Sequence, residues 1–167
     1  MKILYLHGLD SELIPEKREI LEKYAAVLGP TLDYRQNCRI VDFLFNEYKM
    51  ENIDLIMGSS MGGYAGYYLS FLMNKPGLFF NPALPYKNVL QFLPKINFSY
   101  NKFRKIVIGM QDDTIFAAHN IDFLQNTLPK DANAKIEIIN KLQHRVPIDI
   151  FDYEIKLFFD DLKMYMD

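Results

Sequence analysis

Apolar residues fall into short continuous runs along this chain, and the runs alternate with segments in which apolar residues stand three and four positions apart. Continuous runs of four to seven apolar residues indicate buried strands. On this basis we predict strands at 2–6, 31–35, 53–57, 77–80, 104–110 and 134–139, of which 31–35 is the weakest. The helical spacing predicts helices over about 15–28, 40–50, 61–73, 116–128 and 150–166.

Strands that are apolar at every position, instead of at alternate positions, are typical of a parallel sheet covered by helices on both faces. The alternation of such strands with helices predicts an α/β fold with a doubly wound, mostly parallel sheet. The length of 167 residues suits one domain, and residues 1–167 contain no internal repeat or linker. The Pro-punctuated segment 81–102 is the only insertion-like stretch, so we expect no large lid domain.

Ligands of doubly wound sheets bind beyond the carboxyl ends of the strands, so the residues that follow each strand are the candidates for a site. These positions contain a hydroxyl group, imidazoles, carboxylates and backbone turns. They are His7 and Gly8, 58–61, Asn81 and Pro82, 111–113, and the turn around His144. We therefore expect a site with polar chemistry at this edge of the sheet.

The segment Gly58-Ser59-Ser60-Met61-Gly62 fits the pattern G-x-S-x-G, between a predicted strand and a predicted helix. A serine at the tip of such a strand-turn-helix segment has a strained backbone. The positions two residues before and two residues after it have no space for a β-carbon, so glycine fits there. The pattern is typical of a nucleophile elbow that exposes the Ser60 hydroxyl, with the Met61 backbone N–H available to a developing oxyanion. A structural Gly/Ser turn is the alternative. A phosphate loop is excluded because G-x-x-x-x-G-K-[ST] is absent.

A nucleophilic serine needs a base that accepts its proton, and the chain has three histidines. His144 lies a few residues beyond the last predicted strand, where it could reach back over the sheet, so we expect it to be the base. His7 belongs to a His-Gly turn after the first strand, which is expected to bring a backbone N–H near the nucleophile. His119 falls within a helical pattern, which favours a surface or packing role.

The acid that would orient this base is expected directly after the strand at 104–110, where the sequence VIGMQDDTI offers two carboxylates. Adjacent side chains cannot both face one imidazole, so we assign Asp112 to the histidine and Asp113 to capping of the next helix. A metal site on these acids lacks a histidine or a third carboxylate at ligand spacing. The chain order Ser60, Asp112, His144 is the order found in the α/β-hydrolase fold.

The net charge and the cysteine content limit which binding partners and which cellular compartment we expect for this protein. The formal net charge of −2 lacks the basic excess that a phosphate backbone requires, so we expect no nucleic-acid partner. Cys38 is the only cysteine, and the opening MKILYLHG lacks the features of a signal peptide, which predicts a cytoplasmic protein. No membrane span is expected, because serines and glycines interrupt 55–73, the nearest candidate.

The chain resembles the small bacterial YqiA-like esterases of the α/β-hydrolase superfamily. Four segments carry the resemblance: YLHGLDS at 5–11, IMGSSMGGYAGYYLS at 56–70, FFNPALPYKNVL at 79–90 and IGMQDDTIF at 108–116. The resemblance implies Ser60 as nucleophile, His144 as base and Asp112 as its partner. It also implies an oxyanion hole formed by the backbone N–H groups of Met61 and Leu9. The implied activity is hydrolysis of small acyl esters, or of acyl-CoA thioesters, without a cofactor or a metal.

Three alternatives remain open at this stage. The segment NKLQHRVPI around His144 departs from the family pattern, which leaves open the alternative of a catalytically inactive hydrolase-like protein that binds a ligand without turnover. The apolar stripe of the last helix could support a homo-oligomer, although covering the sheet is its simpler role. The aromatic residues of 81–102 suit either an acyl pocket or the core; they are Tyr86, Phe92, Phe98 and Tyr100.

Overall fold

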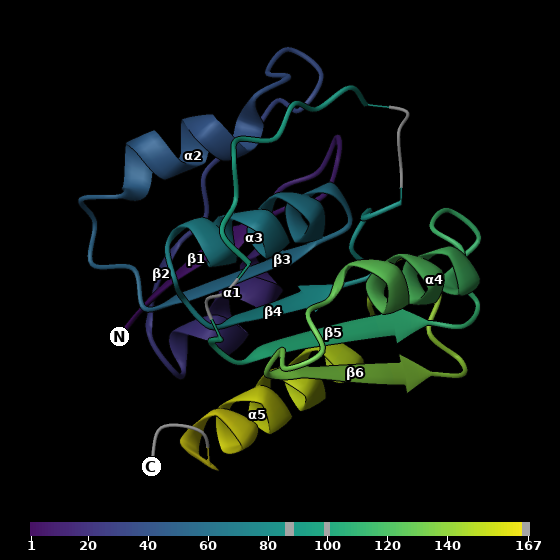
Figure 1. Cartoon of the computed structure of the whole chain (residues 1–167). Coiled ribbons are helices and arrows are strands. Elements are labelled where there is room, and N and C mark those ends of the chain that lie inside the picture. Colours follow the sequence, from purple (N-terminus) through teal and green to yellow (C-terminus); the bar gives the residue numbers. More distant parts are fainter. Residues whose placement is uncertain (86–88, 99–100, 165–167) are drawn as a thin grey trace.

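The strands form a single parallel sheet in the computed structural model, which describes residues 1–85, 89–98 and 101–164 (Figure 1). Every strand pair is parallel, and the order across the sheet is β2-β1-β3-β4-β5-β6. Within the described residues, the strands are β1 (Lys2–Leu6), β2 (Ala26–Leu28), β3 (Leu55–Ser59), β4 (Gly77–Phe80), β5 (Arg104–Gly109) and β6 (Ala134–Ile139). The parallel sheet predicted from the uninterrupted apolar runs is confirmed.

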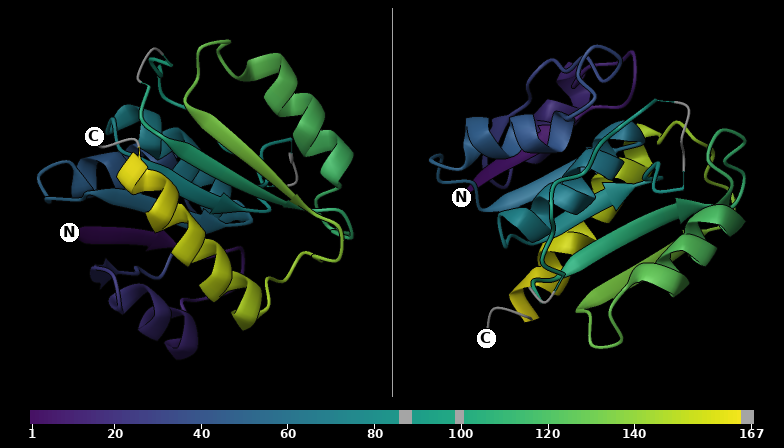
Figure 2. Two further views of the ribbon diagram at one scale, coloured as in Figure 1. Left: turned by 90° about the horizontal axis from the view of Figure 1, so that it is seen from below. Right: turned by 45° about the horizontal axis from the view of Figure 1, so that its top comes forward.

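Helices cover both faces of this sheet. The helices are α1 (Pro15–Glu22), α2 (Ile40–Tyr48), α3 (Met61–Leu72), α4 (Ala117–Thr127) and α5 (Ile148–Met164). Figure 2 shows α2, α3 and α4 on one face of the sheet and α1 and α5 on the other. The buried side chains of α2, α3 and α4 join one hydrophobic core, and those of α1 and α5 join a second. The doubly wound α/β fold class is therefore confirmed.

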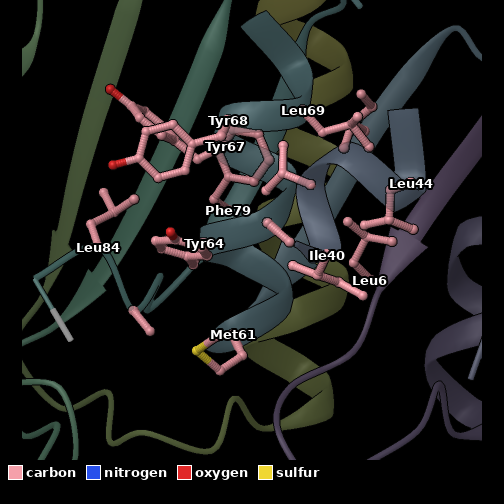
Figure 3. Close-up of a cluster of buried hydrophobic side chains, with 14 of the residues drawn as sticks. Leu6, Ile40, Leu44, Met61, Tyr64, Tyr67, Tyr68, Leu69, Phe79 and Leu84 are labelled. Atoms are coloured by element: carbon pink, nitrogen blue, oxygen red, sulfur yellow. The ribbon is translucent and has the colours of Figure 1, made fainter. Parts of the chain in front are cut away.

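Helix α3 is the most deeply buried helix of the described chain, because every residue from Met61 to Phe71 is buried. Figure 3 shows its aromatic side chains beside Phe79 of β4, with α2 on one side and Leu84 on the other. An all-round apolar helix is the kind that packs inside a protein and not on its surface. Small residues help it to approach the sheet, since a β-carbon at Gly66 would lie 3.0 Å from the Phe79 ring.

The stripe of apolar residues on α5 covers the second face of the sheet. Ile155, Phe158, Phe159 and Leu162 are buried there, and the Phe159 ring stacks on Tyr24 with centroids 4.3 Å apart. Met166, which falls within the helix predicted over 150–166, lies outside the described residues. The stripe contributes to the core of this chain, and the predicted homo-oligomer stays a prediction.

The predictions for the region after the first helix were wrong. The helix predicted over 15–28 ends at Glu22, and the predicted strand at 31–35 is a loop and turn, whereas β2 occupies Ala26–Leu28. Val27 and Leu28 point into the cores on opposite faces, as successive residues of a strand do. Pairing of β2 with Lys2–Leu4 of β1 supplies the tertiary contacts that override the helical spacing.

The sheet has a topological switch point at β1. The chain passes from β1 to β2 through α1 on one face and from β2 to β3 through α2 on the other. The carboxyl ends of β1 and β3 therefore border the crevice where such sheets bind ligands. No helix in the described part of the chain is long and apolar enough to cross a membrane. The cytoplasmic location stays a prediction.

Candidate active site

Ser60 stands at the tip of a sharp turn between β3 and α3. Its backbone has φ 54° and ψ −121°, a left-handed conformation that a residue with a side chain rarely adopts. Its N–H donates to the Phe80 carbonyl at 3.0 Å, and its own carbonyl accepts from the N–H groups of Tyr64 and Ala83 at 2.9 and 3.0 Å. These hydrogen bonds hold the strained turn, so the hydroxyl has a defined position.

The two glycines of the predicted elbow are required by close backbone contacts. A β-carbon at Gly58 would overlap the Gly62 carbonyl group, and one at Gly62 would overlap the carbonyl oxygens of Leu6 and His7. Because these neighbours are main-chain atoms of the sheet and of the turn, they cannot move aside as a flexible side chain could. The geometry agrees with the elbow prediction.

The imidazole of His144 bridges Ser60 and Asp112. Its Nε2 lies 3.0 Å from Ser60 Oγ, and its Nδ1 lies 2.8 Å from Asp112 Oδ2. An ionised carboxylate can only accept a hydrogen bond, so Nδ1 carries the ring proton and donates a hydrogen bond to Asp112. In the neutral ring Nε2 is then free to accept the proton of the Ser60 hydroxyl. The three residues predicted from separate parts of the chain meet in one hydrogen-bonded line.

The Asp112 carboxylate is buried and held by the turn that follows β5. Its Oδ1 accepts from the backbone N–H groups of Thr114 and Ile115 at 2.9 and 2.7 Å, which leaves Oδ2 for the histidine. Asp113 points to solvent, and Phe116 is the N-cap of α4, without a side-chain cap. The prediction that Asp113 caps this helix was wrong, because the helix begins only at Ala117.

The two predicted oxyanion donors, Met61 and Leu9, belong to the chain segments next to the serine. Met61 is the first residue of α3, and the first backbone N–H groups of a helix have no partner within it. On the other side, a β-carbon at Gly8 would lie 3.2 Å from Ser60 Cβ, so the loop that continues to Leu9 passes directly beside the serine. Leu9 lines the same hollow as Ser60. Their catalytic role stays a prediction.

His7 holds the Gly8 loop by its ring. Its Nε2 accepts from the Leu32 N–H at 2.8 Å, so the Nδ1 carries the hydrogen and donates to the Gly8 carbonyl at 2.6 Å. The Tyr34 hydroxyl donates to the His7 carbonyl at 2.6 Å. Because both ring nitrogens of the buried His7 are used, this residue is a positioning group and not a competing base. The third histidine, His119, is exposed on α4.

Asn81 joins three segments at the carboxyl edge of the sheet, and the sequence did not identify this role. Its Nδ2 donates to the Gln143 and His144 carbonyls at 2.8 and 3.1 Å, and its Oδ1 accepts from the Gly109 N–H at 2.7 Å. Its backbone is also left-handed, with φ 40°. The amide thus ties the His144 loop to the ends of β4 and β5. An Asn-Pro pair directly after a strand was the available signal.

A hollow of about 670 Å³ opens beside Ser60 and His144. Its walls come from the loop after β1, the start of α1 and the loop before α5. The lining residues are Tyr5, Gly8, Leu9, Ser11, Glu12, Ile14, Lys17, Ser59, Ser60, Gln143, His144, Arg145, Val146, Pro147 and Ile148. Burial raises the pKa of Tyr5 to about 12, so its hydroxyl, 3.3 Å from Ser59 Oγ, stays protonated at neutral pH.

The aromatic residues of 81–102 do not line this hollow where the structure describes them. Phe98 packs against Tyr68 and Phe71 with ring centroids 6.4 and 4.9 Å apart. Phe92 is largely exposed, with the Arg39 guanidinium 5.8 Å from its ring centroid. Tyr86 and Tyr100 lie outside the described residues. Among the described residues, the 8–17 and 143–148 segments supply most of the lining of the hollow.

No cluster of three histidine, cysteine, aspartate or glutamate residues suited to a metal ion occurs in the described ranges 1–85, 89–98 and 101–164. The Asp112 carboxylate accepts hydrogen bonds from His144 and from two backbone N–H groups, and Asp113 is exposed. The groups in contact with one another at this edge of the sheet are the Ser60 hydroxyl, the His144 imidazole and the Asp112 carboxylate.

This fold is that of the α/β-hydrolase superfamily. The chain matches the sequence profile of an uncharacterised protein family, UPF0227, over residues 2–126, and it belongs to that family. A comparison with curated protein sequences finds no significant match. The predicted resemblance to a small α/β-hydrolase family is confirmed.

Solved structures of low sequence identity share the fold over almost the whole chain. SOBER1 of Arabidopsis thaliana is similar at a TM-score of 0.69 and 14% identity, with 100% of this chain and 99% of that chain covered. Est1E from Butyrivibrio proteoclasticus gives 0.69 and 14%, with 98% and 88% covered. Mouse alpha/beta hydrolase domain-containing protein 10 gives 0.68 and 13%, with 99% and 90% covered.

Proposed function

We propose that this protein is a serine hydrolase that cleaves small acyl esters through an acyl-enzyme intermediate. One observation carries the proposal: His144 Nε2 lies 3.0 Å from Ser60 Oγ while its Nδ1 lies 2.8 Å from Asp112 Oδ2. A serine, a histidine that can accept its proton and a carboxylate that orients the histidine form the arrangement that activates a hydroxyl as nucleophile.

The first half of the reaction would form the acyl-enzyme. Ser60 Oγ attacks the carbonyl carbon of the ester while His144 Nε2 takes the hydroxyl proton. The negative charge that develops on the carbonyl oxygen is stabilised by the backbone N–H groups of Met61 and Leu9. The tetrahedral intermediate then collapses, the bond to the leaving oxygen breaks, and the His144 imidazolium gives its proton to the leaving alcohol.

The second half would release the acid. His144 accepts a proton from a water molecule, the resulting nucleophile attacks the acyl carbon, and Ser60 Oγ leaves with the proton returned by His144. Asp112 stabilises the imidazolium in both halves and keeps Nδ1 protonated. The same steps apply to a thioester, in which a thiol replaces the alcohol, so an acyl-CoA thioester is an alternative substrate. No step requires a metal or an organic cofactor.

Covalent labelling by a fluorophosphonate tests the nucleophile directly. The probe should react with Ser60 of the folded protein, forming a bond between Ser60 Oγ and phosphorus with loss of fluoride. Peptide mass spectrometry is expected to place the label on Ser60 and not on the adjacent Ser59. The Ser60→Ala protein should remain unlabelled, and His144→Ala should react at least about a hundredfold more slowly because its hydroxyl lacks a base.

His119→Ala is the matched control for His144→Ala, since it removes an exposed imidazole on α4. Its labelling rate should equal that of the parent protein. Equal labelling of His144→Ala and the parent would show that the histidine does not activate the serine. In that case the protein would fit the alternative of a hydrolase-like domain that binds without turnover.

Loss of the Asn81 amide should disturb the position of His144 without removing its imidazole. We expect Asn81→Ala to lower kcat for p-nitrophenyl butyrate by about tenfold to a hundredfold, because the Gln143 and His144 carbonyls lose their shared donor. KM should change little, since Asn81 does not line the hollow. Steady-state kinetics separate the two constants, and a raised KM at constant kcat would contradict a positioning role.

A further inference from the structure

Two cationic side chains line the hollow that contains Ser60. Lys17 belongs to α1, and Arg145 directly follows His144 in the loop before α5. They come from segments more than a hundred residues apart in the sequence, and the fold places both on one cavity. The proposed reaction assigns no task to either charge.

Neither cation has an acidic partner in the described part of the chain. Lys17 is half-buried, and its Nζ lies 5.0 Å from the centroid of the buried Phe151 ring. Within residues 1–85, 89–98 and 101–164 no ion pair or side-chain hydrogen bond involves Lys17 or Arg145. Glu12 also lines the hollow but forms no ion pair with them.

The surroundings of Lys17 disfavour its charged form. Burial lowers the pKa of Lys17 to about 8, and the positive charge of Arg145 lowers it in the same direction. By contrast, Lys135 on β6 has Asp161 at 2.8 Å, and its pKa is raised. Lys17 and Arg145 are two like charges on the hollow that contains Ser60, and neither has an ion-pair partner among the described residues, so an anion bound there would neutralise them.

We propose, building on the hydrolase function above, that the substrate of this site is an ester carrying an anionic group, a carboxylate or a phosphate, that Lys17 and Arg145 bind. The planar guanidinium of Arg145 can donate two parallel hydrogen bonds to such a group, and the Lys17 ammonium adds a compact positive charge in the same hollow. The anion can sit on the acyl part or on the leaving group. Both sources present the same chemistry to the two cations.

Matched esters distinguish these sources. For the acyl side, mono-p-nitrophenyl glutarate is compared with p-nitrophenyl pentanoate, which has a methyl group in place of the carboxylate. For the leaving side, 4-(pentanoyloxy)benzoate is compared with its methyl ester. We expect the anionic member of at least one pair to have a kcat/KM about tenfold higher at pH 7 than its neutral partner.

Charge-removing variants assign that preference to the two residues. Lys17→Met and Arg145→Gln should each reduce the anionic-to-neutral ratio by about fivefold or more, and Lys17→Arg should retain it. Lys130→Met serves as the matched control because Lys130 is exposed between α4 and β6, away from the hollow. The ratio should also fall above about pH 8 as Lys17 loses its proton, except in Lys17→Arg, whose guanidinium stays charged.

Failure of this inference differs from failure of the hydrolase function. Suppose that the parent cleaves the neutral esters and Ser60→Ala does not. The anion site is then wrong if neither anionic ester is preferred, or if the preference survives in the Lys17→Met/Arg145→Gln double variant. If no ester is cleaved faster by the parent than by Ser60→Ala, the hydrolase proposal is wrong. Calorimetric binding of both ester pairs to Ser60→Ala then gives the same comparison without turnover, and equal affinities would overturn the anion site.

Discussion

Replacing Ser60 with alanine is expected to lower the rate of p-nitrophenyl butyrate hydrolysis at neutral pH by about three orders of magnitude or more. The variant keeps the turn and the oxyanion donors but has no hydroxyl to form the acyl-enzyme. His144→Ala should lose a similar factor because the hydroxyl keeps its proton. Initial rates followed by p-nitrophenolate absorbance, corrected for spontaneous hydrolysis, measure both changes.

Two further variants separate lost chemistry from lost folding. The Ser60→Ala/His144→Ala double variant should be no slower than either single one, because the members of a triad act as one unit. Ser60→Gly should be inactive but at least as stable as the parent in thermal unfolding, since glycine adopts φ 54° without strain. A parent that turns over no faster than Ser60→Ala would refute the catalytic role of the serine.

Asp112→Asn is expected to lower kcat by about a thousandfold or more although it replaces a single oxygen by nitrogen. The carbonyl oxygen of the new amide would keep the hydrogen bonds from the Thr114 and Ile115 N–H groups, which turns the amide NH₂ toward His144. The amide then donates to Nδ1, so the ring proton moves to Nε2. In that tautomer Nε2 cannot accept the proton of the Ser60 hydroxyl.

Asp113→Asn is the matched control for this change, because Asp113 is adjacent in sequence and exposed. It should retain the parental kcat. Both variants are compared by steady-state kinetics with p-nitrophenyl butyrate and by thermal unfolding. A nearly active Asp112→Asn protein with parental stability would mean that the carboxylate does not set the histidine tautomer.

Local patterns in the sequence accounted for most of the fold. Uninterrupted apolar runs such as the one at 77–80 predicted central parallel strands, because a strand buried on both faces has no polar side. The same reasoning failed at the edge of the sheet. Residues 26–28 have the spacing of a helix, yet they pair with β1, and this pairing depends on a strand more than twenty residues earlier in the chain.

The candidate site likewise contains residues whose place the sequence predicted and one residue whose role it did not predict. Ser60 could be identified because the elbow needs glycines at fixed offsets from it, and Asp112 and His144 because they follow strands whose carboxyl ends share one edge. Asn81 could not be assigned its role, since its amide bonds to carbonyl groups more than sixty residues later. Hydrogen bonds between residues so far apart in the sequence produce no regular spacing of residues that could be recognised in the sequence.

The sequence by itself predicted the elbow, the order of the candidate catalytic residues along the strands and His144, in preference to the other two histidines, as the candidate base. These follow from backbone sterics and from periodicity, which act between residues close in sequence. Only the tertiary structure decided that Val27 and Leu28 form an edge strand and that the 8–17 and 143–148 segments wall the hollow. It also decided that Lys17 and Arg145 line the same hollow as Ser60, because the positions of charges from distant segments depend on how the whole sheet and its helices pack.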